Sequence, residues 1–358
     1  MIPDPARFDF DPLLDFTTDV LTAGGCRETD ARIVARHLVD ANMVGHDSHG
    51  VGMLPAYLAH IKKGLVELDA ELEWLNRMPA LLQADARGGW GAPAAYTALD
   101  EAAARASELG LSCCTLANAH HLGRIGAYAE HLSAKGLASL HFVNVYDHAP
   151  LVAPFRGSDA RFGTNPICIG FPETANNPTF LLDMATSIIA LGKVRVAANK
   201  GITVPPGTLL NDQGMPTTDP SGMAGFEIKG ALTPFARHKG YGLAYASEIL
   251  AGVLSRSGTI QPEHERRGGI QNSMFSIILS PAAFAETDWI DQEIAALGEY
   301  VTQSPPMDWD SPVLIPGAPE RAWRGKRERE GIPLDEKTVD QLNTLAEGLG
   351  IPDRLKGE

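Results

Sequence analysis

Three short polar segments hold side chains whose types and spacing could do chemistry. The first is Gly45-His-Asp-Ser-His-Gly50, where two histidines and a serine lie between two glycines. Histidine exchanges protons near neutral pH, and glycine lets a backbone come close to a ligand. The segment therefore suits a proton donor such as His49 on a tight turn, with Ser48 as a hydrogen-bonding neighbour. The alternative is a capping turn in which Asp47 and Ser48 accept hydrogen bonds from local backbone amides and both histidines face water.

The second segment, Asn118-Ala-His-His-Leu-Gly-Arg-Ile-Gly126, follows an apolar run that predicts a strand over 111–116. In open α/β sheets, ligands bind beyond the carboxyl ends of the strands, which is where this segment is expected. A histidine there can exchange a proton, and the amides that open the next helix can face an anion. Arg124 adds a positive charge that suits a phosphate or a carboxylate. The alternative is a plain strand-to-helix connection with a solvated arginine.

The third segment pairs Arg161-Phe-Gly-Thr-Asn-Pro166 with Leu181-Leu-Asp-Met-Ala-Thr-Ser187, again at predicted strand ends. Asp183 places an acid at the end of an apolar strand. Thr186 and Ser187 can cap the next helix, whose amino end suits a negative group, or they can be a helix cap and nothing more. Two weaker signals are the helix start His238-Lys-Gly-Tyr-Gly242 and the turn Pro316-Gly-Ala-Pro-Glu320.

The motifs of common nucleotide and zinc sites are missing from the sequence. It contains no GxGxxG, GxxxxGK[ST], HExxH or CxxC pattern. A Rossmann phosphate turn, a P-loop and the usual zinc sites are therefore not indicated, and no metal ligand is predicted.

The composition indicates a cytoplasmic protein of about two domains. The 358 residues include 44 acidic and 30 basic side chains, so the net charge is −14. This balance argues against a nucleic-acid partner and against a polybasic membrane-surface protein, since both need a basic face. No apolar run approaches the ~18 residues of a membrane span. We expect the partner to be a small molecule.

Hydrophobic periodicity predicts helices first and an α/β fold after them. The first 65 residues have helical spacing, and from Ala80 onwards strands alternate with helices. The charged tail, 321–358, is expected to be helical and to pack against the N-terminal helices. The expected strands are 80–85, 111–116, 137–145, 168–171, 179–184 and 275–279, and the expected helices after Ala80 are 92–109, 126–135, 187–198 and 240–254.

Six motifs lie in order over nearly the whole chain: Asp47-Ser-His-Gly-Val51, His121-Leu-Gly123, Gly163-Thr-Asn-Pro166, Leu182-Asp-Met-Ala-Thr-Ser187, Lys239-Gly240 and Pro316-Gly317. Together they resemble the malate/L-lactate dehydrogenase family, most of all its hydroxycarboxylate dehydrogenase B branch. The resemblance implies a non-Rossmann NAD(P)-binding α/β fold. It implies a helical terminal domain, 1–75 plus 321–358, and an α/β cofactor- and substrate-binding domain, 76–320. A homodimer, an NAD cofactor (NADP being possible) and interconversion of a 2-oxo acid and a 2-hydroxy acid are also implied.

The resemblance assigns roles to individual residues. Catalysis is assigned to His121, His49 and Ser48, and one histidine protonates the oxygen as hydride arrives, because an alkoxide is a poor product at pH 7. His121 is the favoured acid, and the choice between the two histidines stays open. Substrate contacts are expected from Ser48, Met53, Thr164 and Asn165. Cofactor contacts are expected from His49, Gly123, Arg124, Ile125, Leu181, Leu182, Asp183, Met184, Ala185, His238, Asn272, Gly317, Ala318, Pro319 and Glu320.

One position departs from the family pattern. Many relatives have arginine four residues after the Ser-His-Gly histidine, where it can clamp a substrate carboxylate through two hydrogen bonds. This chain has Met53 there. Either another cation, with Arg124 as a candidate, binds the carboxylate, or the pocket accepts a bulkier apolar 2-oxo acid. The expected substrates are aromatic or small aliphatic 2-oxo acids.

Three alternative functions fit parts of the pattern. A reductase of cyclic imino acids, an activity within the same family, would use the same cofactor. A metal-dependent hydrolase or lyase would use His46, His49 and His121, although their spacing matches no recognisable zinc motif. A non-catalytic protein would bind NADH and turn over nothing.

Overall fold

Helices from both ends of the chain pack into one core. The computed structural model describes residues 5–223, 228–352 and 355–356. Its first core cluster joins side chains such as Leu13, Leu38 and Leu54 with Leu342 and Ala346 from the far end of the sequence. The expected packing of the tail against the N-terminal helices is therefore confirmed. The elements involved are β1 (Ala6–Phe8), α1 (Phe10–Ala23), α2 (Glu28–Met43), α3 (Leu54–Lys62), α9 (Ala318–Glu330), β12 (Ile332–Leu334) and α10 (Glu336–Gly348).

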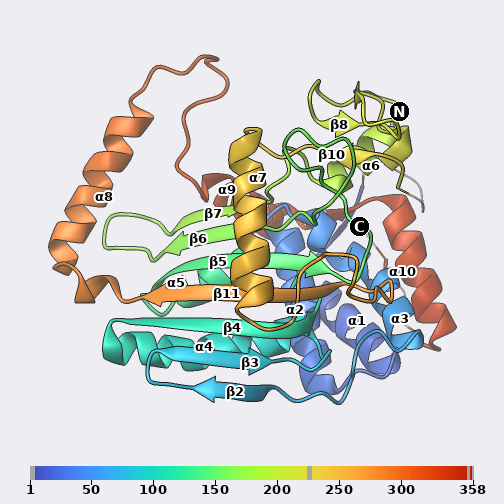
Figure 1. The fold of residues 1–358 in the computed structure, drawn as a ribbon, viewed down its shortest axis with the longest axis horizontal. Coiled ribbons are helices and arrows are strands. Elements are labelled where there is room, and N and C mark those ends of the chain that lie inside the picture. The colour runs from blue at the N-terminus through green and yellow to red at the C-terminus, as the bar shows by residue number, and fades with distance from the viewer. Residues whose placement is uncertain (1–4, 224–227, 353–354, 357–358) are drawn as a thin grey trace.

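A seven-stranded mixed sheet forms the centre of the molecule, with strand order β2-β3-β4-β11-β5-β6-β7. Only β3 and β4 run parallel, and every other pair is antiparallel. Helices α4 (Gly91–Leu109) and α5 (Gly126–Ser133) cover one face, while α7 (His238–Ser247) crosses the other (Figure 1). The strands are β2 (Glu73–Arg77), β3 (Leu81–Asp85), β4 (Leu111–His120), β5 (Ala138–Tyr146), β6 (Ile167–Phe171), β7 (Phe180–Met184) and β11 (Gln271–Leu279).

A third, smaller core lies beyond one end of the sheet. It gathers Val152, Phe162, Val194, Leu209 and Leu232 around a three-stranded sheet of short strands. Its elements are α6 (Leu191–Asn199), β8 (Leu209–Leu210), β9 (Pro216–Thr217) and β10 (Ala231–Leu232). The terminal helices, the central sheet and this smaller unit each have a core cluster of their own.

Every expected strand is present, and several boundaries are corrected. Strand β4 continues to His120, so the second polar segment begins inside the strand instead of after it. Helix α6 begins only at Leu191, because the Thr186 hydroxyl donates to the Thr164 carbonyl and the Ser187 hydroxyl donates to the Ile189 carbonyl. The expectation that these two residues cap the helix is therefore wrong. Helix α7 turns into a π-helix at Glu248–Val253, and the tail contains strand β12.

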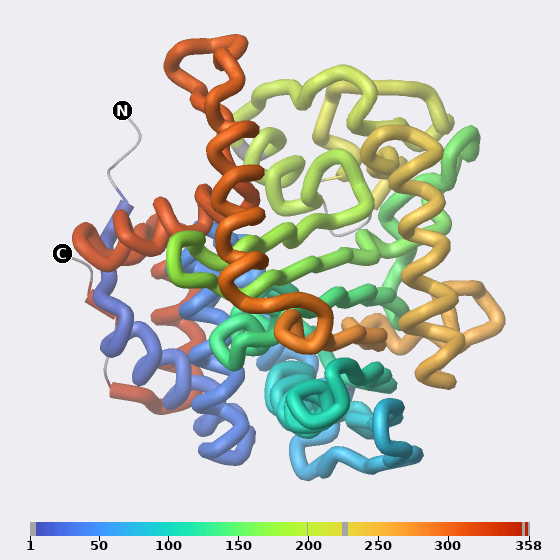
Figure 2. Tube along the Cα trace, turned by 90° about the vertical axis from the view of Figure 1, so that its left-hand side faces the viewer, coloured from blue at the N-terminus to red at the C-terminus, as the bar shows by residue number. Residues whose placement is uncertain are grey.

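Strand β2 and helix α8 (Thr287–Thr302) are the longest of the elements that were not predicted from the sequence. Strand β2 forms one edge of the sheet, and α8 lies at the left of Figure 1 and faces the viewer in Figure 2. Within the described residues, no helix combines the length and the apolar character needed to cross a membrane. The four cysteines, Cys26, Cys113, Cys114 and Cys168, are free thiols.

Candidate active site

The turn that carries His49 is held by an ion pair from the other end of the chain. Helix α2 ends at Met43, and two short 3-10 turns follow at Asp47–His49 and Val51–Met53. Two guanidinium nitrogens of Arg327 on α9 donate to the Asp47 carboxylate at 2.6 and 3.0 Å. Asp47 therefore pairs with Arg327. The alternative, in which Asp47 caps local backbone amides, is not what orders this turn.

Asn42 ties the same turn to α2. Its Nδ2 donates to Asp47 at 2.7 Å, and its Oδ1 accepts from the Val51 amide at 2.8 Å. A Cβ atom at Gly50 would lie 2.2 Å from Asn42 Oδ1. Glycine is required at this position because any side chain would break the contact that fixes the turn.

His49 and His121 face one another across the site. Their ring centroids are 5.7 Å apart and the ring planes differ by 28°. Each ring has a hydroxyl group at Nδ1, because Ser48 Oγ lies 3.0 Å from His49 Nδ1 and Tyr57 Oη lies 2.8 Å from His121 Nδ1. In the described part of the chain neither Nε2 atom has a hydrogen-bond partner, so both are available to a ligand.

A layer of buried rings supports this pair. Tyr57 packs against Trp90 and His120, with ring centroids 5.5 and 5.2 Å apart. His120 Nε2 in turn lies 2.9 Å from His60 Nδ1. The sequence analysis missed Tyr57, since a tyrosine within an apolar helix is ordinarily a core residue and nothing in its spacing marked it.

The turn after His121 is shaped by His37 on α2. The Arg124 amide donates to His37 Nε2 at 3.0 Å, and a Cβ atom at Gly123 would lie 2.5 Å from the same nitrogen. Gly123 also has a φ of +68°, which glycine adopts without strain. The Leu122 amide is fixed by Asn272 Oδ1 at 2.9 Å. This stretch of backbone is therefore fixed by hydrogen bonds, and the His37 ring packs directly against Gly123.

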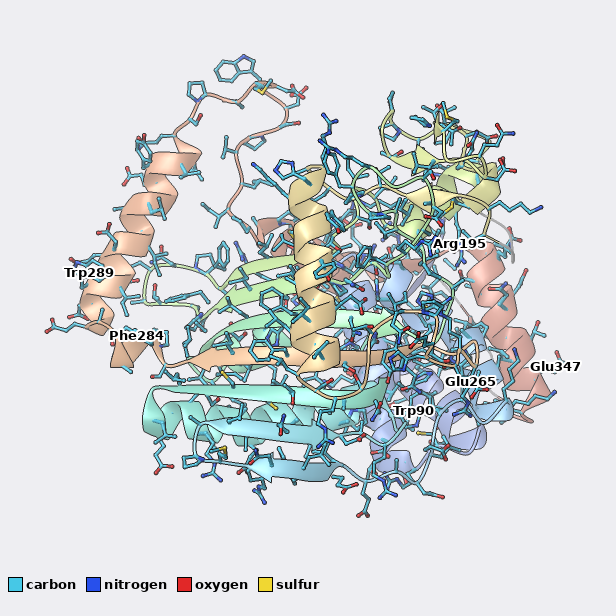
Figure 3. The ribbon with its side chains drawn as sticks, in the orientation of Figure 1. Trp90, Arg195, Glu265, Phe284, Trp289 and Glu347 are labelled. Atoms are coloured by element: carbon cyan, nitrogen blue, oxygen red, sulfur yellow. The ribbon has the colours of Figure 1, made fainter. Side chains whose placement is uncertain are left out.

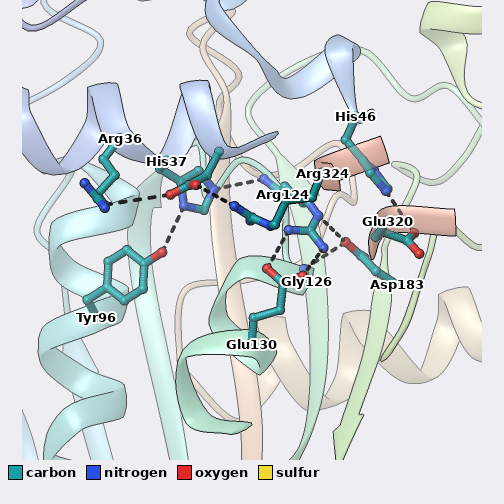
Figure 4. A network of polar contacts seen from close by, with 11 residues as sticks. Arg36, His37, His46, Tyr96, Arg124, Gly126, Glu130, Asp183, Glu320 and Arg324 are labelled. Carbon is teal, nitrogen blue, oxygen red and sulfur yellow. Dashed lines mark hydrogen bonds and ion pairs between the residues drawn. The ribbon is translucent and has the colours of Figure 1, made fainter. Parts of the chain in front are cut away.

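Arg124 is buried and already paired. Its two terminal nitrogens donate to the two Glu130 oxygens at 2.8 and 2.9 Å, and Asp183 lies 3.8 Å from Nε (Figure 4). The side chain is only 1% exposed. The solvated arginine expected as one alternative is wrong, and a guanidinium so engaged has little capacity left for a substrate carboxylate. The Arg124 Nε atom alone is left without a hydrogen-bond partner.

The strand end at Leu181–Ala185 meets both the arginine turn and the start of α9. Asp183 Oδ2 accepts from the Gly126 amide at 2.8 Å, so the anion at the first turn of α5 is the protein's own. The Leu181 amide lies 3.4 Å from the Pro316 carbonyl, and Gly317 adopts a φ of +90° against Leu181. In the first turn of α9, Glu320 lies 3.2 Å from His46 Nε2 (Figure 4).

Four of the expected site residues lie outside this cluster or are already engaged. His238 is exposed at the start of α7, 5.8 Å from the Phe155 ring. Asn165 is fully buried, and its Nδ2 donates to Glu248 at 2.8 Å and to the Ala244 carbonyl. Met53 packs against the terminal helical core, and the Thr164 carbonyl accepts from Thr186.

Burial and neighbouring charges keep the two histidines neutral to different degrees. Burial, followed by the nearby His49, His120, His37 and His148, lowers the pKa of His121 well below its usual value. Burial also lowers the pKa of His49, but the Asp183 carboxylate opposes that shift. Of the two rings, His49 is therefore the one with an anion nearby to stabilise its protonated form.

The clustered segments fit an extended dinucleotide. Gly123 and Gly317 turn the backbone at φ values of +68° and +90°, and among the described residues the buried Arg124 Nε atom has no hydrogen-bond partner. A buried N–H without a partner can donate to a phosphate or ribose oxygen of such a ligand. A bound cofactor would be held by residues 123–125, 181–185 and 317–320, with His49 and His121 at its reactive end. No group of three or more His, Cys, Asp or Glu side chains among the described residues is arranged to hold a metal ion.

Comparison with known proteins shows which family the chain matches. The malate/L-lactate dehydrogenase family model matches residues 8–343. Hydroxycarboxylate dehydrogenase B of Escherichia coli (strain K12) is 41% identical over 97% of this chain and 95% of its own length. A solved putative malate/lactate dehydrogenase from E. coli superposes with a TM-score of 0.92 at 41% identity, covering 97% of this chain and 96% of that one.

A solved Δ1-piperideine-2-carboxylate reductase from Pseudomonas syringae pv. tomato is a more distant neighbour. Its TM-score is 0.82 at 26% identity, with 95% of this chain and 99% of that chain covered. The family model and the relatives extend over both the terminal helices and the central sheet, so they account for the whole architecture. The chain therefore belongs to the malate/L-lactate dehydrogenase family and is a 2-hydroxycarboxylate dehydrogenase of the kind that uses a nicotinamide cofactor.

Proposed function

We propose that the protein interconverts a 2-oxo acid and a 2-hydroxy acid, using NAD as the cofactor and a histidine as the proton donor and acceptor. The observation that carries the proposal is the His49–His121 pair, whose ring centroids are 5.7 Å apart and whose Nε2 atoms have no hydrogen-bond partner among the described residues. When bound, the nicotinamide supplies or accepts the hydride. The protein's part is to orient the acid and to move one proton to or from its oxygen. NADP is the alternative cofactor.

The substrate we propose is an aromatic or small aliphatic 2-oxo acid without a second charged group. Met53 stands where an arginine clamp would be, and Arg124 is occupied by Glu130. A second carboxylate would therefore find neither an arginine at position 53 nor a free terminal nitrogen on Arg124. Ser48 and the two imidazoles are the polar groups left to meet the single carboxylate and the oxo group. Asn165 has less to offer, because its amide nitrogen already bonds Glu248.

The test is the absorbance of reduced nicotinamide during turnover. NADH or NADPH would be mixed with the protein and with pyruvate, phenylpyruvate, hydroxypyruvate, oxaloacetate or piperideine-2-carboxylate. We expect the fastest consumption with NADH and a monocarboxylic 2-oxo acid. Faster turnover of the cyclic imine would favour the second candidate function, an imino-acid reductase. The similarity to a solved Δ1-piperideine-2-carboxylate reductase is the observation that favours this candidate. No consumption with any pair would contradict both.

We also propose that the protein is a homodimer that uses the surface around α8. Exposed aromatic side chains gather on this helix and its flanks, and Phe284 and Trp289 lie at the end of the molecule away from Trp90 (Figure 3). Four aromatics at 58–84% exposure supply on the order of 500 Å² of apolar surface. With their aliphatic neighbours they approach the ~800 Å² per partner of a stable interface. The residues are Phe284, Trp289, Leu297, Tyr300, Val301, Met307, Trp309 and Leu314.

The dimer proposal predicts that Leu297→Asp makes the protein monomeric. Leu297 is 61% exposed on α8, so an aspartate is tolerated in the free chain but would be desolvated in an interface. Light scattering coupled to size-exclusion chromatography should show the mass falling by half. Leu109→Asp is the matched control, because Leu109 is 47% exposed at the end of α4 and the variant should stay dimeric. A monomeric wild-type protein would contradict the proposal.

A further inference from the structure

The Tyr57 hydroxyl has one partner in the described structure. Tyr57 lies on α3, is 2% exposed, and is enclosed by the rings of Trp90 and His120. Its oxygen lies 2.8 Å from His121 Nδ1, and no other hydrogen bond to this hydroxyl is present among the described residues. Burial raises the pKa of Tyr57 far above its ordinary value, so the hydroxyl keeps its proton at any working pH.

This arrangement decides which nitrogen of His121 carries the proton. A buried hydroxyl proton needs an acceptor, because a buried donor without a partner loses the hydrogen bond that it would make with water. His121 Nδ1 is the acceptor within reach, and it can accept only through its lone pair. In neutral His121 the single ring proton must then sit on Nε2. The Nε2 atom faces the site as a hydrogen-bond donor and has no lone pair with which to take a proton from a substrate.

His49 is placed differently. Its Nδ1 atom meets Ser48 Oγ, and a serine hydroxyl that is open to solvent can either donate or accept. The charged or titratable groups that act on His49 are Asp183, His46 and Arg124. Those that act on His121 are all histidines: His49, His120, His37 and His148. Only His49 has both a rotatable partner and an anion nearby to stabilise an imidazolium.

We propose that Tyr57 is a positioning residue that holds His121 as a fixed Nε2–H donor to the substrate, so that His49 is the histidine that exchanges the proton. This inference rests on the proposed function and reverses the order expected from the family resemblance, in which His121 was the favoured acid. In reduction, hydride adds to C2, the C2=O π pair becomes the alkoxide lone pair, and that oxygen takes the proton from His49 Nε2. Neutral His49 then regains a proton from solvent, and oxidation runs the same steps in reverse.

The tautomer can be measured without any turnover. Nitrogen-15 NMR of protein labelled with ¹⁵N-histidine distinguishes a protonated Nε2 from a protonated Nδ1, and His121→Gln identifies the His121 signals. We expect Nε2–H alone in the wild type and a mixture of tautomers in Tyr57→Phe. Tyr96→Phe is the matched control, because its hydroxyl lies 3.4 Å from a different ring, His37, and the His121 signals should not move. A protonated Nδ1 in the wild type would overturn the proposal.

The pH profile of kcat/KM tests the division of roles. Reduction needs protonated His49, so kcat/KM should be highest below the pKa of His49 and should decrease as the pH rises through that pKa. Because burial lowers the pKa of His49 from its ordinary value of about 6.5, the decrease should occur below about pH 6.5. His49→Gln should lose this limb, whereas His121→Gln and Tyr57→Phe should keep it at a rate about tenfold lower. A limb that persists in His49→Gln and vanishes in His121→Gln would contradict the assignment. Failure of the wild type with every substrate would refute the proposed function instead, and the NMR result would still stand.

Discussion

Replacing His49 with glutamine is expected to lower kcat/KM for 2-oxo acid reduction by about 10²–10⁴-fold, the usual worth of a positioned acid or base. Glutamine keeps a polar group of similar reach but cannot carry an extra proton. His49 is held at the correct place by the Asp47–Arg327 pair and faces His121 at 5.7 Å. The loss should fall on kcat more than on the KM of the cofactor, because the missing proton is needed only in the transition state.

Initial rates of nicotinamide oxidation would measure this effect, and His121→Gln is the paired comparison. His121→Gln retains an N–H donor and should lose only about tenfold, because a neutral hydrogen bond contributes about 0.5–1.5 kcal/mol. Thermal unfolding of both variants checks that each is folded. A loss below tenfold for His49→Gln, with a larger loss for His121→Gln, would return the acid–base role to His121.

Removing the partner of Arg124 is expected to destabilise the fold by about 3 kcal/mol, since breaking a buried ion pair leaves an uncompensated charge. In Glu130→Ala the guanidinium, 1% exposed, would keep only Asp183 at 3.8 Å. Urea unfolding measures the change in the free energy of unfolding. The turn 123–125 should loosen as well, so the Kd for NADH should rise in the same variant.

Glu101→Ala is the matched control for this variant. Glu101 also bonds arginines, Arg77 and Arg105, but all three side chains are 28–50% exposed. Exposed pairs contribute about 0–1 kcal/mol, so this substitution should leave stability nearly unchanged. An equal loss of unfolding free energy in Glu130→Ala and Glu101→Ala would contradict the expectation that burial strengthens the contribution of the Arg124–Glu130 pair.

Much of the architecture could be predicted from local patterns. The strands and the long helix α4 follow from apolar periodicity, and the polar segments lie at or near the ends of elements, although the second of them begins inside β4. Asp183 was expected at a strand end, and it lies there against the first turn of α5. These features depend on residues close together in the sequence, which is why spacing alone identifies them.

What could not be predicted depends on partners far apart in the sequence. Arg327 and Asp47 are 280 residues apart, and Tyr57 and His121 are 64 apart. From the sequence alone, Arg124 could be a solvated or a ligand-binding cation. The structure shows that both of its terminal nitrogens donate to Glu130. Helix α8 is a different case, because Ile290, Ile294, Leu297 and Val301 recur at helical spacing and the pattern was present in the sequence but overlooked.

In the proposed reaction, hydride passes between a nicotinamide and C2 of a 2-oxo acid on this protein. Reduction of phenylpyruvate or pyruvate with NADH carrying deuterium at the transferable C4 position tests it directly, with NMR and mass spectrometry of the product. We predict a 2-hydroxy acid with one deuterium at C2, at a rate that falls in His49→Gln. A product without deuterium at C2, or deuterium retained in the nicotinamide after turnover, would contradict the account.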